Sequence, residues 1–257
     1  MEQSPSTDQE PPGPPEIPRS KLIAWWGSIF GVCAIIAFGS IFVTRAYLAR
    51  TAYENENWRP PHVARLETDI DLINRDSREV SLSEMEDHIF VAGYQYTDCP
   101  AGCLGLASVM KDLEDQFGND PRFRLVSISV NPAEDTPEKM DAWVKDKGID
   151  SPDWYFLTGD PEEITKYMIS EFMFQGTQEN TDPAVIASQG KFAHDQRLAI
   201  VDGEANIRGY YDVLHLQRGD IEYKRLVRDL KMVLNPDLKL SDLPPIMPPR
   251  PVQSAKQ

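Results

Sequence analysis

Cys99 and Cys103 stand where an apolar segment gives way to a helical pattern. Their four-residue separation is about one helical turn, or roughly 6 Å of rise, so both sulfurs can face the same way. Such a pair can form a disulfide or hold one metal ion. The start of a helix also favours the thiolate form of a cysteine. We therefore predict redox or metal chemistry, with two structural cysteines as the alternative; the Cys-x-x-Cys spacing of thioredoxins is one residue shorter.

His194 is the candidate for a third ligand. It lies in a polar segment before an apolar strand (197–202), and in thioredoxin-like folds the loop before that strand abuts the active-site pair. Two thiolates and one imidazole suit Cu(I), accept Cu(II) with an added oxygen or water, and can in principle hold zinc. We expect copper. His62, His88 and His215 have no comparable setting and are expected to be structural or solvated.

Three further residues are expected to have ordinary roles. Asp195 either orients the ring of His194 or is an exposed turn residue, and the second interpretation is preferred. Asp98 is expected to be solvated. Cys33 lies in an apolar run, where it is expected to pack as a small hydrophobic side chain.

The elements that must position these residues alternate between strands and helices. Strands are predicted at 70–74, 78–82, 88–97, 122–130, 154–158, 197–202 and 205–212. Helices are predicted at 101–117, 136–148, 160–173 and 217–234, and a long polar loop at 175–191. This order predicts an α/β fold with a largely parallel central sheet.

The N-terminal part predicts a membrane anchor. Residues 22–44 carry no charge over a length of about 34 Å as a helix, enough to cross a hydrocarbon core of roughly 30 Å. The absence of a good small-residue cleavage site favours an uncleaved anchor over a signal peptide. Residues 1–20 hold six prolines and predict a disordered tail. This tail is acidic, unlike a mitochondrial transit peptide, which favours a bacterial origin.

The remaining boundaries follow from composition and charge. A linker is expected at 45–64, the α/β domain at 65–235, and a proline-rich tail at 236–257. Residues 51–257 carry 22 bases and 37 acids, so no basic surface is available for a phosphate backbone. Nucleic-acid binding is excluded.

Four segments together resemble the Sco/SenC copper proteins. They are VAGYQYTDCPAGC (91–103), VNPAEDTPEKMDAW (130–143), WYFLTG (154–159) and FAHDQRLAIVD (192–202). The resemblance covers about 65–235 and implies a thioredoxin-like fold with an N-terminal hairpin behind a single transmembrane helix. It also implies a role in assembling the dinuclear copper centre of cytochrome c oxidase.

The resemblance implies a ligand set and an orientation. Cys99, Cys103 and His194 match the family's two cysteines and distant histidine, which bind copper as Cu(I) or Cu(II). The C-terminal domain is then periplasmic, behind a single pass through the bacterial inner membrane. The chain departs from the family at Leu104, where proline is usual, at Ala193 before the histidine, and at Asn131, where aspartate is usual. All three predicted ligands are present despite these departures.

The expected function is that of a membrane-anchored chaperone that delivers copper to cytochrome c oxidase subunit II or another cuproprotein, without covalent catalysis. Residues 22–44 would contact the lipid bilayer. The alternative is a thiol–disulfide oxidoreductase that uses Cys99 and Cys103 to reduce the cysteines of an oxidase subunit before metallation. Peroxide reduction requires a threonine three residues before the reactive cysteine, whereas Thr97 is two before Cys99. A copper or redox sensor remains open.

Overall fold

The computed structural model describes residues 18–100 and 102–246, without the side chains of residues 52, 55, 102 and 103. The chain divides into two compact units, Met1–Asn55 and Glu56–Gln257. The expected tail at 1–20 therefore lies mostly outside the described residues, as does the end of the expected tail at 236–257.

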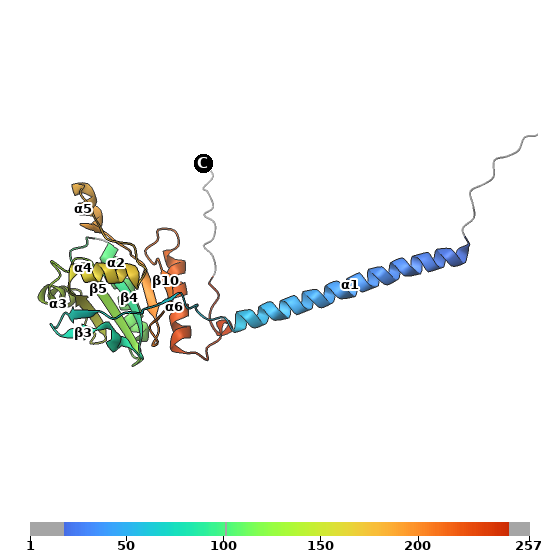
Figure 1. Ribbon diagram of the computed structural model, residues 1–257, viewed down its shortest axis with the longest axis horizontal. Helices are drawn as coiled ribbons and strands as arrows, with labels where there is room; N and C mark the ends of the chain where they lie inside the picture. Colours follow the sequence, from blue (N-terminus) through green and yellow to red (C-terminus); the bar gives the residue numbers. More distant parts are fainter. Residues whose placement is uncertain (1–17, 101, 247–257) are drawn as a thin grey trace, which may run out of the picture. The chain divides into compact units, whose positions relative to one another are not determined.

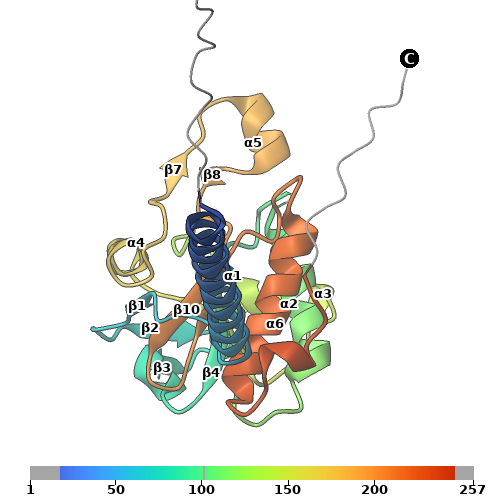
Figure 2. The ribbon, with the colours of Figure 1, turned by 90° about the vertical axis from the view of Figure 1, so that its right-hand side faces the viewer.

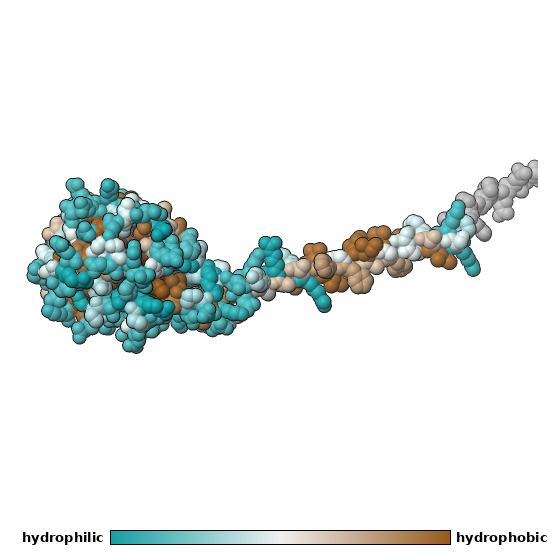
Figure 3. Space-filling model, turned by 60° about the horizontal axis from the view of Figure 1, so that its bottom comes forward, coloured by the Kyte–Doolittle hydropathy of each residue, from teal (hydrophilic) through white to brown (hydrophobic). Residues whose placement is uncertain are grey.

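Helix α1 (Arg19–Glu56) contains the predicted transmembrane segment and continues through most of the expected linker. Its apolar side chains are exposed along its length, and Cys33 is among the exposed residues (Figure 3). By length and composition, Arg19–Thr51 is the one described segment that could cross a membrane. A signal sequence near an N-terminus passes the same test.

An eight-stranded sheet forms the centre of the second unit, with strand order β1-β10-β9-β4-β5-β6-β2-β3. The strands are β1 (Ala64–Arg65), β2 (Asp71–Asn74), β3 (Glu79–Ser81), β4 (Ile89–Gln95), β5 (Phe123–Ser129), β6 (Trp154–Thr158), β9 (Leu198–Val201) and β10 (Asn206–Tyr211). Only the β4–β5 and β5–β6 pairs are parallel, and the other pairs are antiparallel. The expectation of a largely parallel sheet was wrong, because both hairpins add antiparallel strands at its sides.

Helices cover both faces of this sheet (Figure 2). One face packs against α2 (Gly102–Phe117), α3 (Pro137–Asp146) and α6 (Gly219–Leu234), and the other against α4 (Pro161–Ser170) and the segment that follows it. Strand β4 is buried along its whole length, with Val91 on the first face and Phe90 on the second. Side chains of a strand alternate between faces, so β4 serves both cores.

Local signals explain where the helices begin. The Thr136 hydroxyl group accepts a hydrogen bond from Lys139 N at the start of α3, and Pro137 occupies the first helical position. Asp160 caps α4 in the same way. Two short 3-10 helices complete the unit, Leu82–Met85 and Leu240–Asp242.

The segment predicted as a long loop is structured. Residues 175–191 hold strand β7 (Gln178–Glu179) and helix α5 (Pro183–Gln189), and β7 pairs with β8 (Phe192–Ala193). This extension projects beyond the main sheet (Figure 1). No residue of α5 is buried, so this helix lacks a face that packs into the core.

Candidate metal centre

Strand β4 leads directly to the first cysteine. The strand ends at Gln95, and Tyr96, Thr97 and Asp98 connect it to Cys99, before α2 begins at Gly102. Cys99 is buried, with 5% of its surface exposed. The sequence prediction of a cysteine at a strand-to-helix junction is confirmed for this residue.

The connection after β4 is held by the buried carboxylate of Asp135. Thr97 Oγ1 donates to Asp135 Oδ1 at 2.5 Å, and Ser129 Oγ donates to Asp135 Oδ2 at 2.6 Å. Burial raises the pKa of the Asp135 carboxyl group, and these hydrogen bonds oppose the shift. Asp98 was expected to be solvated; it is exposed but forms an ion pair with Lys139 Nζ at 2.5 Å. An exposed pair of this kind contributes little stability.

His194 follows β8 and has a defined ring orientation. Its Nδ1 atom lies 2.9 Å from the backbone oxygen of Asp195. A carbonyl oxygen only accepts hydrogen bonds, so this contact places the proton on Nδ1 and leaves the lone pair of a neutral ring on Nε2. Metal-binding histidines commonly hold their second ring nitrogen in this way. His194 is therefore prepared to act as a ligand through Nε2.

Two tyrosines of the cysteine-bearing segment contact the imidazole. The rings of Tyr94 and Tyr96 meet the ring of His194 edge to face, with centroids 5.9 and 5.7 Å apart. Tyr94 lies in β4 and Tyr96 directly follows it, and both side chains belong to the core on the same face of the sheet, which explains why both contact His194. Neither tyrosine was predicted as part of the site, because aromatic side chains at these positions are typical of a hydrophobic core.

Asp195 is not the exposed turn residue that was expected. Only 5% of its surface is exposed, and its carboxylate accepts hydrogen bonds from Arg197 Nη2 at 2.6 Å and from Gln175 N at 3.0 Å. Burial acts to raise its pKa, but the bonds from Arg197 and the backbone outweigh burial and hold the pKa of Asp195 below its ordinary value. Its side chain fixes the turn, and its backbone carbonyl contacts the His194 ring.

Cys103, the second cysteine of the predicted pair, has a side chain outside the described residues. Its pairing with Cys99, as a disulfide or as a metal site, therefore stays a prediction. Among the described side chains, no group of three histidine, cysteine, aspartate or glutamate residues is arranged to hold a metal ion. A hollow of about 340 Å³ borders His194 and Gln175–Gln178.

The other histidines have structural or solvent contacts, as predicted. His88 Nδ1 lies 3.0 Å from the backbone oxygen of Glu86, and His215 Nδ1 accepts from the backbone N–H groups of Gln217 and Arg218. His62 is exposed.

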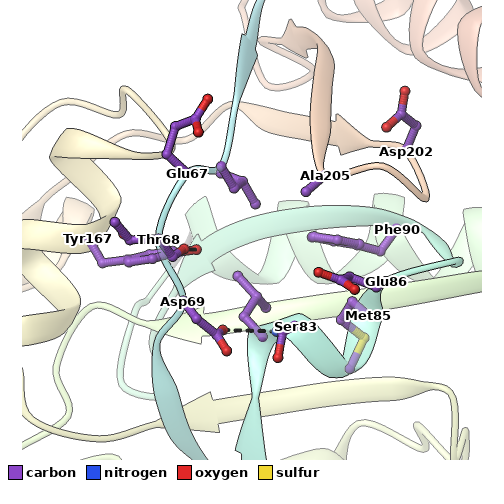
Figure 4. A pocket seen from close by; sticks show the side chains of 12 residues that line it. Glu67, Thr68, Asp69, Ser83, Met85, Glu86, Phe90, Tyr167, Asp202 and Ala205 are labelled. Carbon is purple, nitrogen blue, oxygen red and sulfur yellow. Dashed lines mark hydrogen bonds between the residues drawn. The ribbon is translucent and has the colours of Figure 1, made fainter.

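A second hollow, of about 140 Å³, lies near the beginning of β4 rather than its cysteine-bearing end (Figure 4). Carboxylates surround an apolar floor that includes Met85 and Phe90. Asp69 accepts from Ser83 N at 2.9 Å, and Asp202 accepts from Arg208 Nη1 at 2.9 Å. The carboxylates of Asp69 and Asp202 thus already have partners within the protein, and we assign no ligand to this hollow.

Comparisons with known proteins agree with this architecture. The family described as SCO1/SenC matches residues 59–228, more than half of the chain. The SCO1 protein homolog of Bacillus subtilis (strain 168) is 27% identical over 101 residues, which are 38% of this chain and 52% of the relative. The match thus spans about half the length of that curated relative.

Solved structures share the fold. A SCO1/SenC family lipoprotein from Bacillus anthracis has a TM-score of 0.58 at 20% identity, covering 68% of this chain and 99% of that one. BsSco, described as a member of the Sco family of cytochrome c oxidase assembly proteins with a disulfide switch, has a TM-score of 0.54 at 19% identity, covering 68% and 96%. Bradyrhizobium japonicum ScoI, solved with copper bound, has a TM-score of 0.50 at 20% identity, covering 65% and 98%.

These neighbours show that the globular unit has the thioredoxin-like fold of Sco proteins. With the family match over residues 59–228, they lead to one conclusion: this chain is a member of the SCO1/SenC family.

Proposed function

We propose that this protein is a membrane-anchored copper chaperone that supplies copper to the dinuclear centre of cytochrome c oxidase, through subunit II or another cuproprotein. Membership in the SCO1/SenC family supports this role, as do the copper-bound ScoI structure and the description of the Sco family as oxidase assembly proteins. Copper is the cargo in this proposal, so the chain binds and releases it without covalent catalysis.

The ring orientation of His194 is the observation that carries the proposal. Nδ1 donates a hydrogen bond to the backbone oxygen of Asp195, so Nε2 is the ring atom whose lone pair would bind copper. The thiolates of Cys99 and Cys103 would supply the soft ligands that Cu(I) prefers, and Nε2 of His194 would complete a three-coordinate site. A three-coordinate ion is open to an incoming thiolate of the recipient, which permits transfer by ligand exchange.

We further propose the organisation that delivery requires. The apolar residues 22–44 within α1 anchor the chain in the bacterial inner membrane, with the globular unit at 65–235 in the periplasm. In this arrangement the proline-rich segments 1–20 and 236–257 lie on opposite sides of the membrane.

A thiol–disulfide oxidoreductase is the second candidate. Its support is the Cys99–Cys103 spacing and the disulfide switch described for BsSco. It would reduce the cysteines of an oxidase subunit through the two thiols alone, so His194 would be dispensable.

One experiment separates the two functions. The full-length chain in detergent is reduced, loaded with Cu(I) and mixed without oxygen with the reduced apo form of a soluble subunit II domain, and the copper content of the re-isolated domain is measured. A parallel assay measures reduction of the disulfide form of that domain. We expect His194→Ala to abolish copper transfer and His88→Ala to leave it unchanged. Disulfide reduction that survives His194→Ala, with no copper transfer from wild type, would instead support the oxidoreductase.

A further inference from the structure

Tyr96 joins the segment that carries Cys99 to the strand that leads to His194. Its side chain is 3% exposed, and its hydroxyl oxygen accepts a hydrogen bond from Phe192 N at 3.2 Å. Its ring also meets the rings of Phe192 and His194, each with centroids 5.7 Å apart. One side chain therefore contacts both the start of β8 and the histidine that follows it.

Gly190 lies on the other side of the same hydroxyl group. A Cβ atom built at this position would be 2.0 Å from Tyr96 Oη and 3.0 Å from Cδ of Pro100. The residue has φ +93° and ψ 171°, a backbone conformation that is essentially restricted to glycine. Asn180 Nδ2 donates to the Gly190 carbonyl oxygen at 2.8 Å, which ties this residue to the β7 side of the extension.

The contacts at Tyr96 and Gly190 bring three segments into direct packing. Pro100 follows Cys99, Gly190 ends α5, and Phe192 begins β8. Displacement of residue 190 away from the Tyr96 hydroxyl group would carry β8 with it, and His194 lies at the end of β8. The separation between the cysteine turn and the histidine thus depends on how closely residue 190 approaches Tyr96.

We propose that the Tyr96 hydroxyl group and the side-chain-free Gly190 form a spacer that sets the position of His194 relative to the Cys99–Pro100 turn. If the proposed function holds, this spacer also determines the geometry of the copper site, and that part of the inference rests on the proposed function. Tyr96 and Gly190 are positioning residues and contribute no ligand.

Two substitutions and their combination test the spacer. Tyr96→Phe removes only the hydroxyl group, while Gly190→Ala introduces a methyl group into the space that the hydroxyl fills. The double variant lacks the hydroxyl oxygen that would lie 2.0 Å from the new Cβ atom. The atoms nearest to that Cβ are then Pro100 Cδ at 3.0 Å and the ring carbon Cζ of residue 96 at 3.2 Å. An alanine at this positive φ is strained in either background, so the double variant should recover only part of the wild-type behaviour. The effects of the two changes should still be non-additive, with the double variant closer to wild type than Gly190→Ala alone.

Two matched controls account for general effects of the substitutions. Tyr223→Phe removes a hydroxyl group that accepts from Gln116 on the α2–α6 side of the unit. Gly148→Ala introduces a methyl group at another positive φ, +63°, where nothing lies within 4 Å. Both controls share the chemistry of the test variants, but neither contacts the cysteine turn or β8.

The full-length protein in detergent is studied first without metal, by long-range ¹H–¹⁵N spectra of the histidine rings. We expect a single His194 tautomer with the proton on Nδ1 in wild type and in both controls. Tyr96→Phe loses the bond from Phe192 N and should shift the His194 signals slightly, and Gly190→Ala should change them more, with a return toward wild type in the double variant. Cu(II) electron paramagnetic resonance and competitive Cu(I) titration follow. We expect Gly190→Ala to change the Cu(II) spectrum and to weaken Cu(I) binding by about 10-fold or more, as is typical of substitutions at residues that support a metal ligand.

The results of these experiments test the spacer separately from the proposed copper site. If Gly190→Ala gives wild-type ring signals, spectrum and affinity, or if the double variant is no better than Gly190→Ala, the spacer is overturned while the chaperone proposal stands. If wild-type copper binding does not depend on His194, the proposed function fails, and the metal-free ring spectra still decide whether the spacer positions His194.

Discussion

The backbone oxygen of Asp195 lies 2.9 Å from Nδ1 of its neighbour His194, while the carboxylate of the same Asp195 is bound to Arg197. One residue thus uses its main chain to orient the imidazole and its side chain to hold the turn that carries it. The guanidinium of Arg197 also lies 4.7 Å from the centre of the Tyr210 ring, which anchors this turn on β10.

The Asp195–Arg197 pair predicts a pH-dependent contribution to stability. The folded protein holds the pKa of Asp195 below its unfolded value of about 3.9, so the pair stabilises the fold above that pH. Its contribution is lost as the pH falls through the lower, folded pKa. We expect Asp195→Asn to reduce the free energy of unfolding by about 2 kcal/mol at pH 7. The difference from wild type should shrink below about pH 4, as measured by urea unfolding at several pH values. A difference that is constant from pH 3 to pH 7 would contradict this account.

Thr97 and Thr158 make a matched pair for testing the support beneath the cysteine turn. Thr97 Oγ1 donates to the buried Asp135, whereas Thr158 Oγ1 is buried without a hydrogen-bond partner among the described residues. Thr97→Val should lower the free energy of unfolding by about 1–3 kcal/mol, because Asp135 loses a donor. Thr158→Val should be neutral or slightly stabilising, since it removes an unsatisfied polar group. Equal effects of the two substitutions in urea unfolding would contradict the prediction that the Thr97–Asp135 hydrogen bond stabilises the protein.

The anchor proposal predicts how the full chain partitions between membrane and solution. Wild-type protein should stay with membranes during alkaline extraction and dissolve in detergent. Ile35→Lys places a charge in the middle of the apolar segment at a cost of about 2.5–3.5 kcal/mol and should increase the extracted fraction. Leu48→Lys, beyond that segment, should have little effect. Release of wild type without detergent would mean that residues 22–44 act as a cleaved signal or lie outside the bilayer.

Much of the fold could be predicted from local patterns in the sequence. The apolar run before Cys99 predicted β4, and the Thr136–Pro137 and Asp160–Pro161 pairs predicted the starts of α3 and α4. The same signal was present at Asp182–Pro183, where Asp182 caps α5. It was overlooked because this short helix has no apolar face.

The contacts around His194 could not be predicted in the same way. Tyr96 and Phe192 are far apart in the chain and meet only because β4 pairs with β9, which follows β8 by a few residues. The burial of Asp195 likewise depends on Gln175 N, which an intervening structured extension brings back to the turn. Such contacts depend on tertiary geometry, which local sequence periodicity does not report.

Copper binding by the reduced protein tests the central claim most directly. The full-length chain in detergent is reduced without oxygen, and Cu(I) is titrated against a coloured competing chelator for wild type and for Cys99→Ser, Cys103→Ser and His194→Ala, with His88→Ala as the control. The account predicts one tightly bound Cu(I) in wild type and in His88→Ala, and loss of tight binding in each of the other three variants. Weak binding by wild type, or tight binding that is unchanged in His194→Ala, would contradict it.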